Sequence, residues 1–248
     1  MKPFIFDISG RALKKKVQGL LLSPDWLSAK KALESLPARK AVNPLTGFLC
    51  SSDENVRWRA VEALGIVVSH LAKKEPESAR VVLRRLLWML NDESGGIGWG
   101  APEAIGEILA RDGGRLAEEF GRLLVSYVNP SANFLEHPAL RRGALWGIGR
   151  LAQVRPDITL AATDDLYSLL SDPDPANRGL AARALGLMAA PGVSDGLCRL
   201  LCEPFPVNVW EDGQIRHVTV AGLARKALAS ARPLGYTGES RPPGSDKP

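Results

Sequence analysis

The chain has 248 residues, of which 45% are hydrophobic and 24% are charged, and its net charge is +5. This balance is typical of a folded protein with an apolar core, and the modest positive charge permits an acidic partner without requiring one. The sequence has no apolar run of about 18 residues and no signal-like N-terminus, so we expect a cytoplasmic protein that does not cross or bind a membrane.

Two helices are predicted at the start of the chain, over residues 11–22 and 24–36. We expect Ser23 to cap the second helix and Pro24 to occupy its first position, where a missing backbone N–H is tolerated. The consecutive lysines Lys14, Lys15 and Lys16 suit an outer face in water. This pair is therefore predicted to cap one end of a larger helical array.

A triplet of a small residue, an aliphatic residue and glycine then recurs, at spacings of 41, 43, 37 and 38 residues. The copies, of which the last ends in alanine, are Ala63-Leu64-Gly65, Ala104-Ile105-Gly106, Gly147-Ile148-Gly149, Ala184-Leu185-Gly186 and Gly222-Leu223-Ala224. An apolar segment with helical spacing precedes each copy, and turns rich in Ser, Asp and Pro join the two parts, as at 51–54 and 171–174. Each unit is therefore predicted to be an apolar helix followed by an Ala-rich helix, whose first turn an Asp or Ser caps.

A helix pair of this kind cannot bury its apolar face alone, so the pairs must stack. We predict an all-α fold, an α-solenoid of about six stacked antiparallel helix pairs, forming a single domain over residues 1–230. Residues 231–248 are rich in proline, glycine, serine and charge. They cannot bury enough apolar surface to offset their ordering entropy, so we expect a disordered C-terminal tail.

One unit carries an apolar run at 166–170, a turn at 172–174, Asn177-Arg178, Ala181 and the triplet at 184–186. This pattern resembles the HEAT repeat, and most closely the variant of phycobilisome-lyase-like repeat proteins. The resemblance extends over roughly residues 9–230. It implies a superhelical solenoid of armadillo type, in which the second helix of each pair lines the concave face. It implies little about function, because such solenoids bind many kinds of partner.

Residues 94–107 (SGGIGWGAPEAIGE) depart from the repeat pattern. Pro102 favours the first turn of a helix, so the second helix of this repeat is predicted to begin late, near Ala101. Residues 93–100 then form a glycine-rich loop. The missing side chains either open the backbone and Trp99 to a ligand or permit close packing against a neighbouring segment. The spacing is not that of a phosphate-binding P-loop.

The repeat register places a set of candidate binding residues around this loop on the concave face. They are Trp58, Arg59, Glu62, Gly98, Trp99, Gly100, Glu103, Arg142 and Trp146. Trp99 and Glu103 are one helical turn apart, so they can form one cup with Arg142 and Trp146. The alternative is that Trp58 and Trp146 fill the core between repeats.

Three turns within repeats are enlarged, at residues 92–100, 129–137 and 203–214. All three join a first helix to a second helix, so they are expected on one edge of the solenoid. Insertions gathered on one edge often form the binding side of a repeat protein. Phe134, His137, Phe205 and Trp210 are the candidate partner-binding residues in these turns.

Arginine recurs at the start of the predicted second helices, as Arg57, Arg141, Arg178 and Arg216. One hypothesis is a basic stripe for phosphate or an acidic partner. The other, implied by the HEAT resemblance, is that each arginine pairs with a turn aspartate of a neighbouring repeat. The available aspartates are Asp53, Asp92, Asp172 and Asp212.

Few residues point to catalysis or metal binding. Cys50, Cys198 and Cys202 do not form a disulfide framework, and we expect buried or boundary thiols, with Cys198 and Cys202 one turn apart on a helix. The histidines are far apart in sequence, and neither a metal site nor a catalytic set nor a cofactor is predicted. Whether any reaction is catalysed, and the oligomeric state, stay open.

The leading functional hypothesis is a non-enzymatic scaffold or adaptor that holds a protein or peptide partner on its concave face and enlarged loops. The alternative follows from a resemblance to HEAT-like alkylpurine DNA glycosylases, with Trp99 and Glu103 around a base and Arg142 on a phosphate. A weaker alternative, from the repeat similarity alone, is a bilin-lyase-like chaperone.

Overall fold

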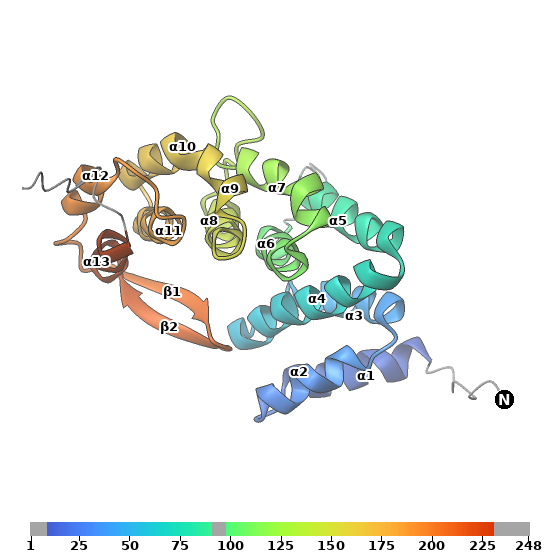
Figure 1. Ribbon diagram of the computed structural model, residues 1–248. Coiled ribbons are helices and arrows are strands. Elements are labelled where there is room, and N and C mark those ends of the chain that lie inside the picture. The colour runs from blue at the N-terminus through green and yellow to red at the C-terminus, as the bar shows by residue number, and fades with distance from the viewer. Residues whose placement is uncertain (1–8, 91–97, 231–248) are drawn as a thin grey trace, which may run out of the picture.

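The computed structural model describes residues 9–90 and 98–230, and it forms an arc of stacked helix pairs, as Figure 1 shows. The α-helices in chain order are α1 (Gly10–Leu21), α2 (Trp26–Glu34), α3 (Ala38–Phe48), α4 (Glu54–Lys74), α5 (Pro76–Leu90), α6 (Ala101–Asp112), α7 (Arg115–Ser126), α8 (Pro138–Ala152), α9 (Pro156–Thr159), α10 (Thr163–Ser168), α11 (Pro175–Leu187), α12 (Ser194–Arg199) and α13 (Val220–Ser230). Two short 3-10 helices, Leu160–Ala162 and Leu169–Ser171, flank α10. The predicted helical solenoid is confirmed.

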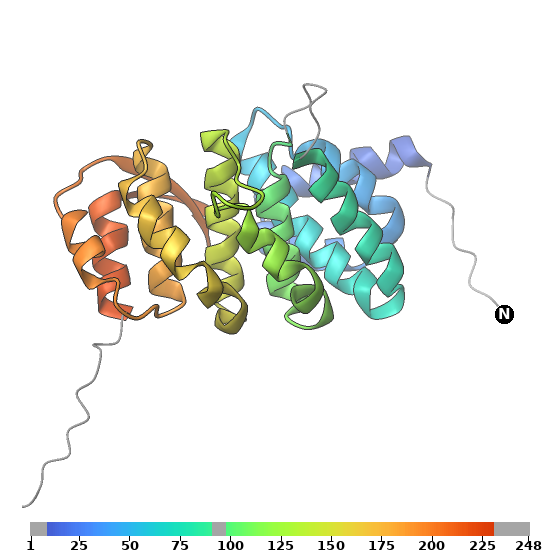
Figure 2. The same cartoon turned by 90° about the horizontal axis from the view of Figure 1, so that it is seen from above.

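The helices form two layers. The inner layer follows the repeat triplets and contains α4, α6, α8, α11 and α13, while α3, α5, α7, α10 and α12 lie outside (Figure 1). Within the inner layer α6 packs between α4 and α8, and α11 packs between α8 and α13. Seen from above in Figure 2, neighbouring pairs lie side by side along the length of the molecule. The small residues of the triplets allow this close stacking.

The closest approach between inner helices is that of α6 and α8, where Gly106 faces Gly147. A Cβ atom on Gly106 would lie 2.2 Å from the Cα of Gly147. We expect Gly106→Ala to lower the free energy of unfolding by about 1–3 kcal/mol, because the two helices must move apart. Urea unfolding followed by circular dichroism measures this loss.

The matched control is Gly19→Ala on α1, where a Cβ atom would meet nothing within 4 Å. Removing the backbone freedom of this glycine should leave stability unchanged or raise it by about 0.5–1 kcal/mol. Equal effects of the two substitutions would contradict the packing argument.

The helix caps follow the predicted turns in two places and differ in a third. Asp53 caps α4 and Asp174 caps α11, each accepting backbone N–H groups of the first turn. The predicted cap Ser23 is wrong, because Asp25 caps α2 and its carboxylate accepts from Ser28 N at 3.0 Å. The helix therefore begins at Trp26, and Pro24 lies before it. A carboxylate one residue from the helix outcompetes a hydroxyl further away.

The enlarged turn at 203–214 belongs to a β-hairpin, which the all-helical prediction did not include. Strands β1 (Pro206–Glu211) and β2 (Gln214–Thr219) pair antiparallel, from Pro206 opposite Thr219 to Glu211 opposite Gln214. Asp212 and Gly213 form the turn with φ values of 53° and 79°. Asp-Gly is a preferred pair for such two-residue turns.

The hairpin does not project from the edge of the solenoid as expected. It extends from α13 along the inside of the arc toward α4 (Figure 1). At its tip a Cβ atom on Gly213 would lie 3.0 Å from the indole of Trp26 in α2. The hairpin therefore spans the concave face from the last helix to the first repeats.

Two predictions lie outside the described residues, or largely so. The C-terminal tail, residues 231–248, is one of them, and most of the glycine-rich loop, residues 93–97, is the other. The predicted late start of the following helix is confirmed, because α6 begins at Ala101. Within the described part of the chain, no helix is both long and apolar enough to cross a membrane.

Candidate functional site

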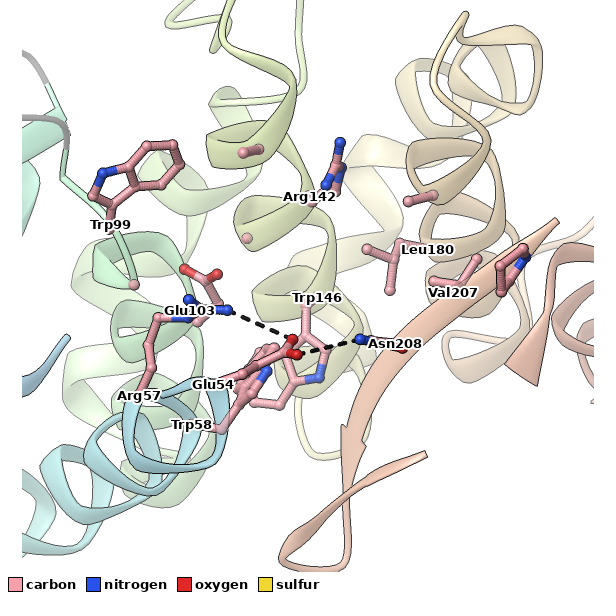
Figure 3. A pocket seen from close by; sticks show the side chains of 15 residues that line it. Glu54, Arg57, Trp58, Trp99, Glu103, Arg142, Trp146, Leu180, Val207 and Asn208 are labelled. Carbon is pink, nitrogen blue, oxygen red and sulfur yellow. Dashed lines mark hydrogen bonds and ion pairs between the residues drawn. The ribbon is translucent and has the colours of Figure 1, made fainter. Parts of the chain in front are cut away.

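A cavity of about 460 Å³ opens on the concave face between α4, α6, α8, α11 and β1, and we call it the tryptophan cavity (Figure 3). Its lining residues are Glu54, Arg57, Trp58, Trp99, Gly100, Glu103, Ala139, Arg142, Gly143, Trp146, Ala176, Leu180, Pro206, Val207 and Asn208. The inner helices of four successive repeats and the hairpin thus contribute to one site.

Three tryptophans from distant parts of the chain form one wall of this region, which we call the tryptophan wall. Trp58 and Trp146 have ring centroids 4.8 Å apart, and Trp210 stacks on Trp58 at 6.1 Å with nearly parallel rings. The indole N–H of Trp146 donates to the carbonyl of Trp210 at 3.1 Å. The wall fastens the hairpin to α4 and α8. The indole Nε1 of Trp58 is buried and has no acceptor among the described residues.

A carboxyl group with one unsatisfied oxygen atom lines the cavity. Glu103 is on the first turn of α6, and a Cβ atom on Gly143 of α8 would lie 2.5 Å from its Oε2. The absence of a side chain at Gly143 therefore makes room for the Glu103 carboxyl group. Oε2 is buried and accepts no hydrogen bond within the described part of the chain.

Burial raises the pKa of Glu103 to about 7, and the backbone N–H of Glu103 and the positive charge of Arg57 offset only part of this effect. The charged form is destabilised because it loses more hydration than these groups replace. Figure 3 shows the carboxyl group pointing into the cavity beside α8. A ligand that brings a positive charge or hydrogen-bond donors here would remove this cost.

The mouth of the cavity combines an aromatic ring with paired charges. Trp99 is 37% exposed and meets the ring of His137 edge-on at 5.2 Å. Arg142 is exposed and pairs with Asp174, the carboxylate that caps the next inner helix. On the opposite side Asn208 of the hairpin donates to Glu54 at 3.3 Å (Figure 3).

The structure brings together most of the candidate residues of the concave face. Trp58, Trp99, Gly100, Glu103, Arg142 and Trp146 all line the tryptophan cavity. The N-terminal position of α6 is occupied by Gly100 with φ of 73°, a left-handed conformation that favours glycine. Trp58 and Trp146 are also buried, so they serve the core and the cavity at once.

Three candidates from the same set lie elsewhere. Arg59 donates to the carbonyls of Leu21 and Ser23, both at 2.8 Å, and ties α4 to the first repeat. Glu62 lines a second cavity, described below. Gly98 is buried, and a Cβ atom there would lie 2.6 Å from the carbonyl of Met89, so this glycine serves close packing.

The candidates in the enlarged turns have different environments. Trp210 is buried in the tryptophan wall, so its expected exposure to a partner is wrong. The reason is that a large indole ring is more stable when it packs against other rings than when it is exposed to water. Phe205 is 48% exposed, with the guanidinium of Arg178 5.9 Å from its ring. Phe134 is half-buried under Arg141, and His137 caps α8 through Nδ1.

The recurring arginines have acidic partners, which favours their structural role. The buried pair of Arg141 and Asp172 joins neighbouring repeats at 3.0 Å, as the HEAT resemblance implies. Arg178 instead pairs with Glu203 at 2.6 Å. Arg57 lies 3.5 Å from Glu54 of its own helix. The expectation that the fourth arginine begins a second helix is wrong, because Arg216 lies on β2.

The prediction of buried or boundary thiols is also wrong. All three cysteines are free and exposed rather than buried, and α12 ends at Arg199, so Cys198 and Cys202 do not share one helix. Among residues 9–90 and 98–230, no group of three or more His, Cys, Asp or Glu side chains is arranged to hold a metal ion.

Sequence reasoning missed nine of the fifteen lining residues as part of the cavity, among them the polar or space-making Glu54, Arg57, Gly143 and Asn208. Gly143 could have been recognised, because it directly follows the predicted cup residue Arg142 in an alanine-rich helix. No sequence signal indicated Asn208, because its position depends on where the hairpin folds.

The comparisons with known proteins agree with the fold. Residues 138–188 match the HEAT-like repeat family. An uncharacterized protein of Archaeoglobus fulgidus is 34% identical over 125 residues, which are 50% of this chain and 59% of that protein. The match thus spans little more than half of that relative.

Among solved structures, a designed armadillo repeat protein is 21% identical, with a TM-score of 0.50 over 89% of this chain and 100% of its own. An engineered protein is 20% identical, with a TM-score of 0.51 over 88% of this chain and 96% of its own. A second designed armadillo repeat protein, in complex with the peptide (KR)4, is 21% identical, with a TM-score of 0.50 over 89% and 99%. These similarities establish the helical repeat architecture. The narrower resemblance to phycobilisome-lyase-like repeats stays a prediction.

Proposed function

We propose that this HEAT-like repeat protein is a binding scaffold that holds a protein or peptide partner on its concave face, with one basic side chain of the partner in the tryptophan cavity. The observation that carries the proposal is the buried Glu103 carboxyl group, whose Oε2 has no hydrogen-bond partner among the described residues. The cavity of about 460 Å³ is large enough for one long side chain.

A basic side chain fits the chemistry of this cavity better than a neutral one. A guanidinium or ammonium group beside Glu103 would restore the donors that burial removes, and a pair formed in a desolvated site is stronger than one in water. The indole rings of Trp99 and Trp146 line the same cavity and offer π-faces to a cation. Glu103 would then lose its proton as the partner binds.

The hairpin limits where the rest of a partner can lie. It covers the concave face beside the tryptophan wall, so an extended peptide cannot follow the groove along its whole length. The mouth near Trp99, His137 and Arg142 stays accessible. A similarly folded designed armadillo protein is known with the peptide (KR)4, which supports basic peptides as a first class of ligand to test.

The direct test is a titration of the protein with fluorescein-labelled (KR)4 peptide and with a citrulline octapeptide of the same length. The net charge of +5 disfavours unspecific attraction of a basic peptide, so binding would report the local site. We expect the basic peptide to bind and Trp99→Ala to weaken it at least about tenfold, through loss of the cation–π contact and of the cavity wall.

The matched control is Trp88→Ala on the outer helix α5, where the indole is 73% exposed and does not line the cavity. It should leave affinity within about twofold, since it removes an indole but no contact in the cavity. Equal binding of the basic and citrulline peptides, or equal loss in both variants, would overturn the proposal.

A nucleic-acid ligand is the second candidate, because Trp99 and Glu103 lie together in the cavity with Arg142 at its mouth. A cationic alkylated base could occupy the same place as a basic side chain. Against it, Arg142 already pairs with Asp174 and is not free for a phosphate. Titration with fluorescent duplex DNA at about 50 and 200 mM salt distinguishes the two, because phosphate contacts give steep salt dependence.

A further inference from the structure

A second cavity of about 290 Å³ lies on the concave face, and we call it the arginine cavity. It is lined by α2, α4, α6, α8, α11 and the hairpin around its turn, and Trp146 borders both this cavity and the tryptophan cavity. Its lining contains four cations, which are Lys30, Arg111, Arg150 and Arg183. It is independent of the proposed peptide site, because none of these cations lines the tryptophan cavity.

The two buried carboxylates of this cavity, Glu62 and Glu107, are fully engaged. Glu62 accepts from the indole of Trp26 at 2.9 Å and pairs with Lys30 and Arg111, both at 3.1 Å. Glu107 bonds Arg111 and, at 2.7 Å, the Nε of Arg150. Three of the four cations therefore have short contacts with buried acceptors, and no buried carboxylate is left for the fourth.

The fourth cation is Arg183 of α11, which is only 9% exposed. Its Nη1 is buried and has no hydrogen-bond acceptor within residues 9–90 and 98–230. Its ionic contact is with Glu211 of the hairpin, at a long 3.9 Å. A Cβ atom on Gly149 would lie 2.9 Å from Nη1, so the absence of a side chain at Gly149 makes room for the guanidinium group against α8.

Without a ligand, the surroundings of Arg183 destabilise its charged guanidinium group. Burial lowers the pKa of Arg183, Glu211 partly compensates, and the nearby positive charge of Arg150 adds to the cost. A guanidinium group holds its proton in proteins, so the cost cannot be avoided by deprotonation. A buried charge needs a charged or hydrogen-bonding partner, and Glu211 at the exposed rim supplies only a distant one.

We propose that the arginine cavity binds a small oxyanion, a carboxylate or a phosphate, with Arg183 as its main contact. The planar guanidinium fork suits two oxygens of one anion, which would satisfy the vacant Nη1 donor. Glu211 competes for the same cation from the hairpin turn, while Asp212 lies beside it on the rim. Anion binding would thus replace a long contact by short ones.

The test uses the intact protein with sodium phosphate and sodium malonate as probes, and sodium chloride at matched ionic strength as the reference. Binding is followed by the melting temperature and by tryptophan fluorescence, since Trp146 and Trp210 line the cavity. We expect at least one of the two oxyanions to raise the melting temperature beyond chloride. The comparison of phosphate with malonate identifies which oxyanion the cavity prefers.

Two variants make the assignment specific. Glu211→Gln removes the competing carboxylate at the rim and should tighten anion binding at least about threefold, without emptying a buried position. Arg183→Gln should abolish the effect, and Arg183→Lys, which keeps the charge but not the fork, should weaken it. Stabilisation no greater than that by chloride, or unchanged affinity in Glu211→Gln and Arg183→Lys, would overturn the proposal.

Discussion

Replacing Trp210 with alanine is expected to lower the free energy of unfolding by about 3–5 kcal/mol, the range for truncating a buried tryptophan. The side chain is 5% exposed and stacks on Trp58, while its own carbonyl accepts the indole N–H of Trp146. The substitution keeps the carbonyl but removes the ring contact with Trp58 of α4, so it should also loosen the hairpin on the concave face. Urea unfolding measures the first effect, and limited proteolysis within residues 206–219 measures the second.

The control is Trp88→Ala, because Trp88 is 73% exposed on α5. An exposed side chain without special contacts should change stability by less than about 0.5 kcal/mol. If the two alanine variants unfold at the same urea concentration, with the hairpin equally resistant to protease, the tryptophan wall does not hold the hairpin in place.

The second large effect on stability is expected from Glu103→Gln, which should stabilise the protein where Trp210→Ala destabilises it. The folded-state pKa of about 7 lies above the ordinary value of 4.5, so the folded protein binds this proton more tightly than the unfolded chain. The contribution of this group to stability is therefore fully present below about pH 4.5, falls as the pH rises toward 7, and stays lost above it. At pH 8 the neutral glutamine should stabilise the protein by about 2–3 kcal/mol relative to the wild type.

At pH 4 both residues are uncharged, so the same variant should then match the wild type. Chemical unfolding at pH 4, 6 and 8 tests this, with Glu34→Gln on the exposed side of α2 as a control that should stay within about 0.5 kcal/mol. An equal effect of Glu103→Gln at pH 4 and pH 8 would mean that Glu103 is not the titrating group.

This variant also separates stability from function. Glu103→Gln should make the free protein more stable at pH 8 while weakening the basic peptide, because it removes the carboxylate that would face the cation. An opposite change in stability and affinity is common where a binding site contains a group that is destabilised until its ligand binds. A gain in both stability and affinity would argue for a neutral ligand instead.

The repeat architecture was predictable from the residue pattern alone. The spacing of the small-residue triplets marked the inner helices, and the position of Pro102 located the start of α6 at Ala101. The turn aspartates Asp53 and Asp174 were recognisable as caps. These features are local or repeat at a fixed period, so short-range rules are sufficient to find them.

Part of the tryptophan cavity was also predictable. Trp99 and Glu103 are one turn apart, and the repeat register aligned them with Arg142 and Trp146 of the next repeat. Stacked repeats place equivalent positions side by side, so the register carries such residues to one face. The hairpin itself had a local signal, since Asp212-Gly213 lies between two segments with strand-like alternation.

The position of that hairpin, and the surface that it covers, follow from contacts between distant parts of the chain. Trp210 meets Trp146 across 64 positions of sequence, and Asn208 meets Glu54 across 154. No periodicity links such positions, because the contacts depend on how the whole arc curves. For the same reason the unsatisfied Oε2 of Glu103 and Nη1 of Arg183 emerged only in three dimensions, because whether a buried polar atom has a partner depends on every neighbouring element at once.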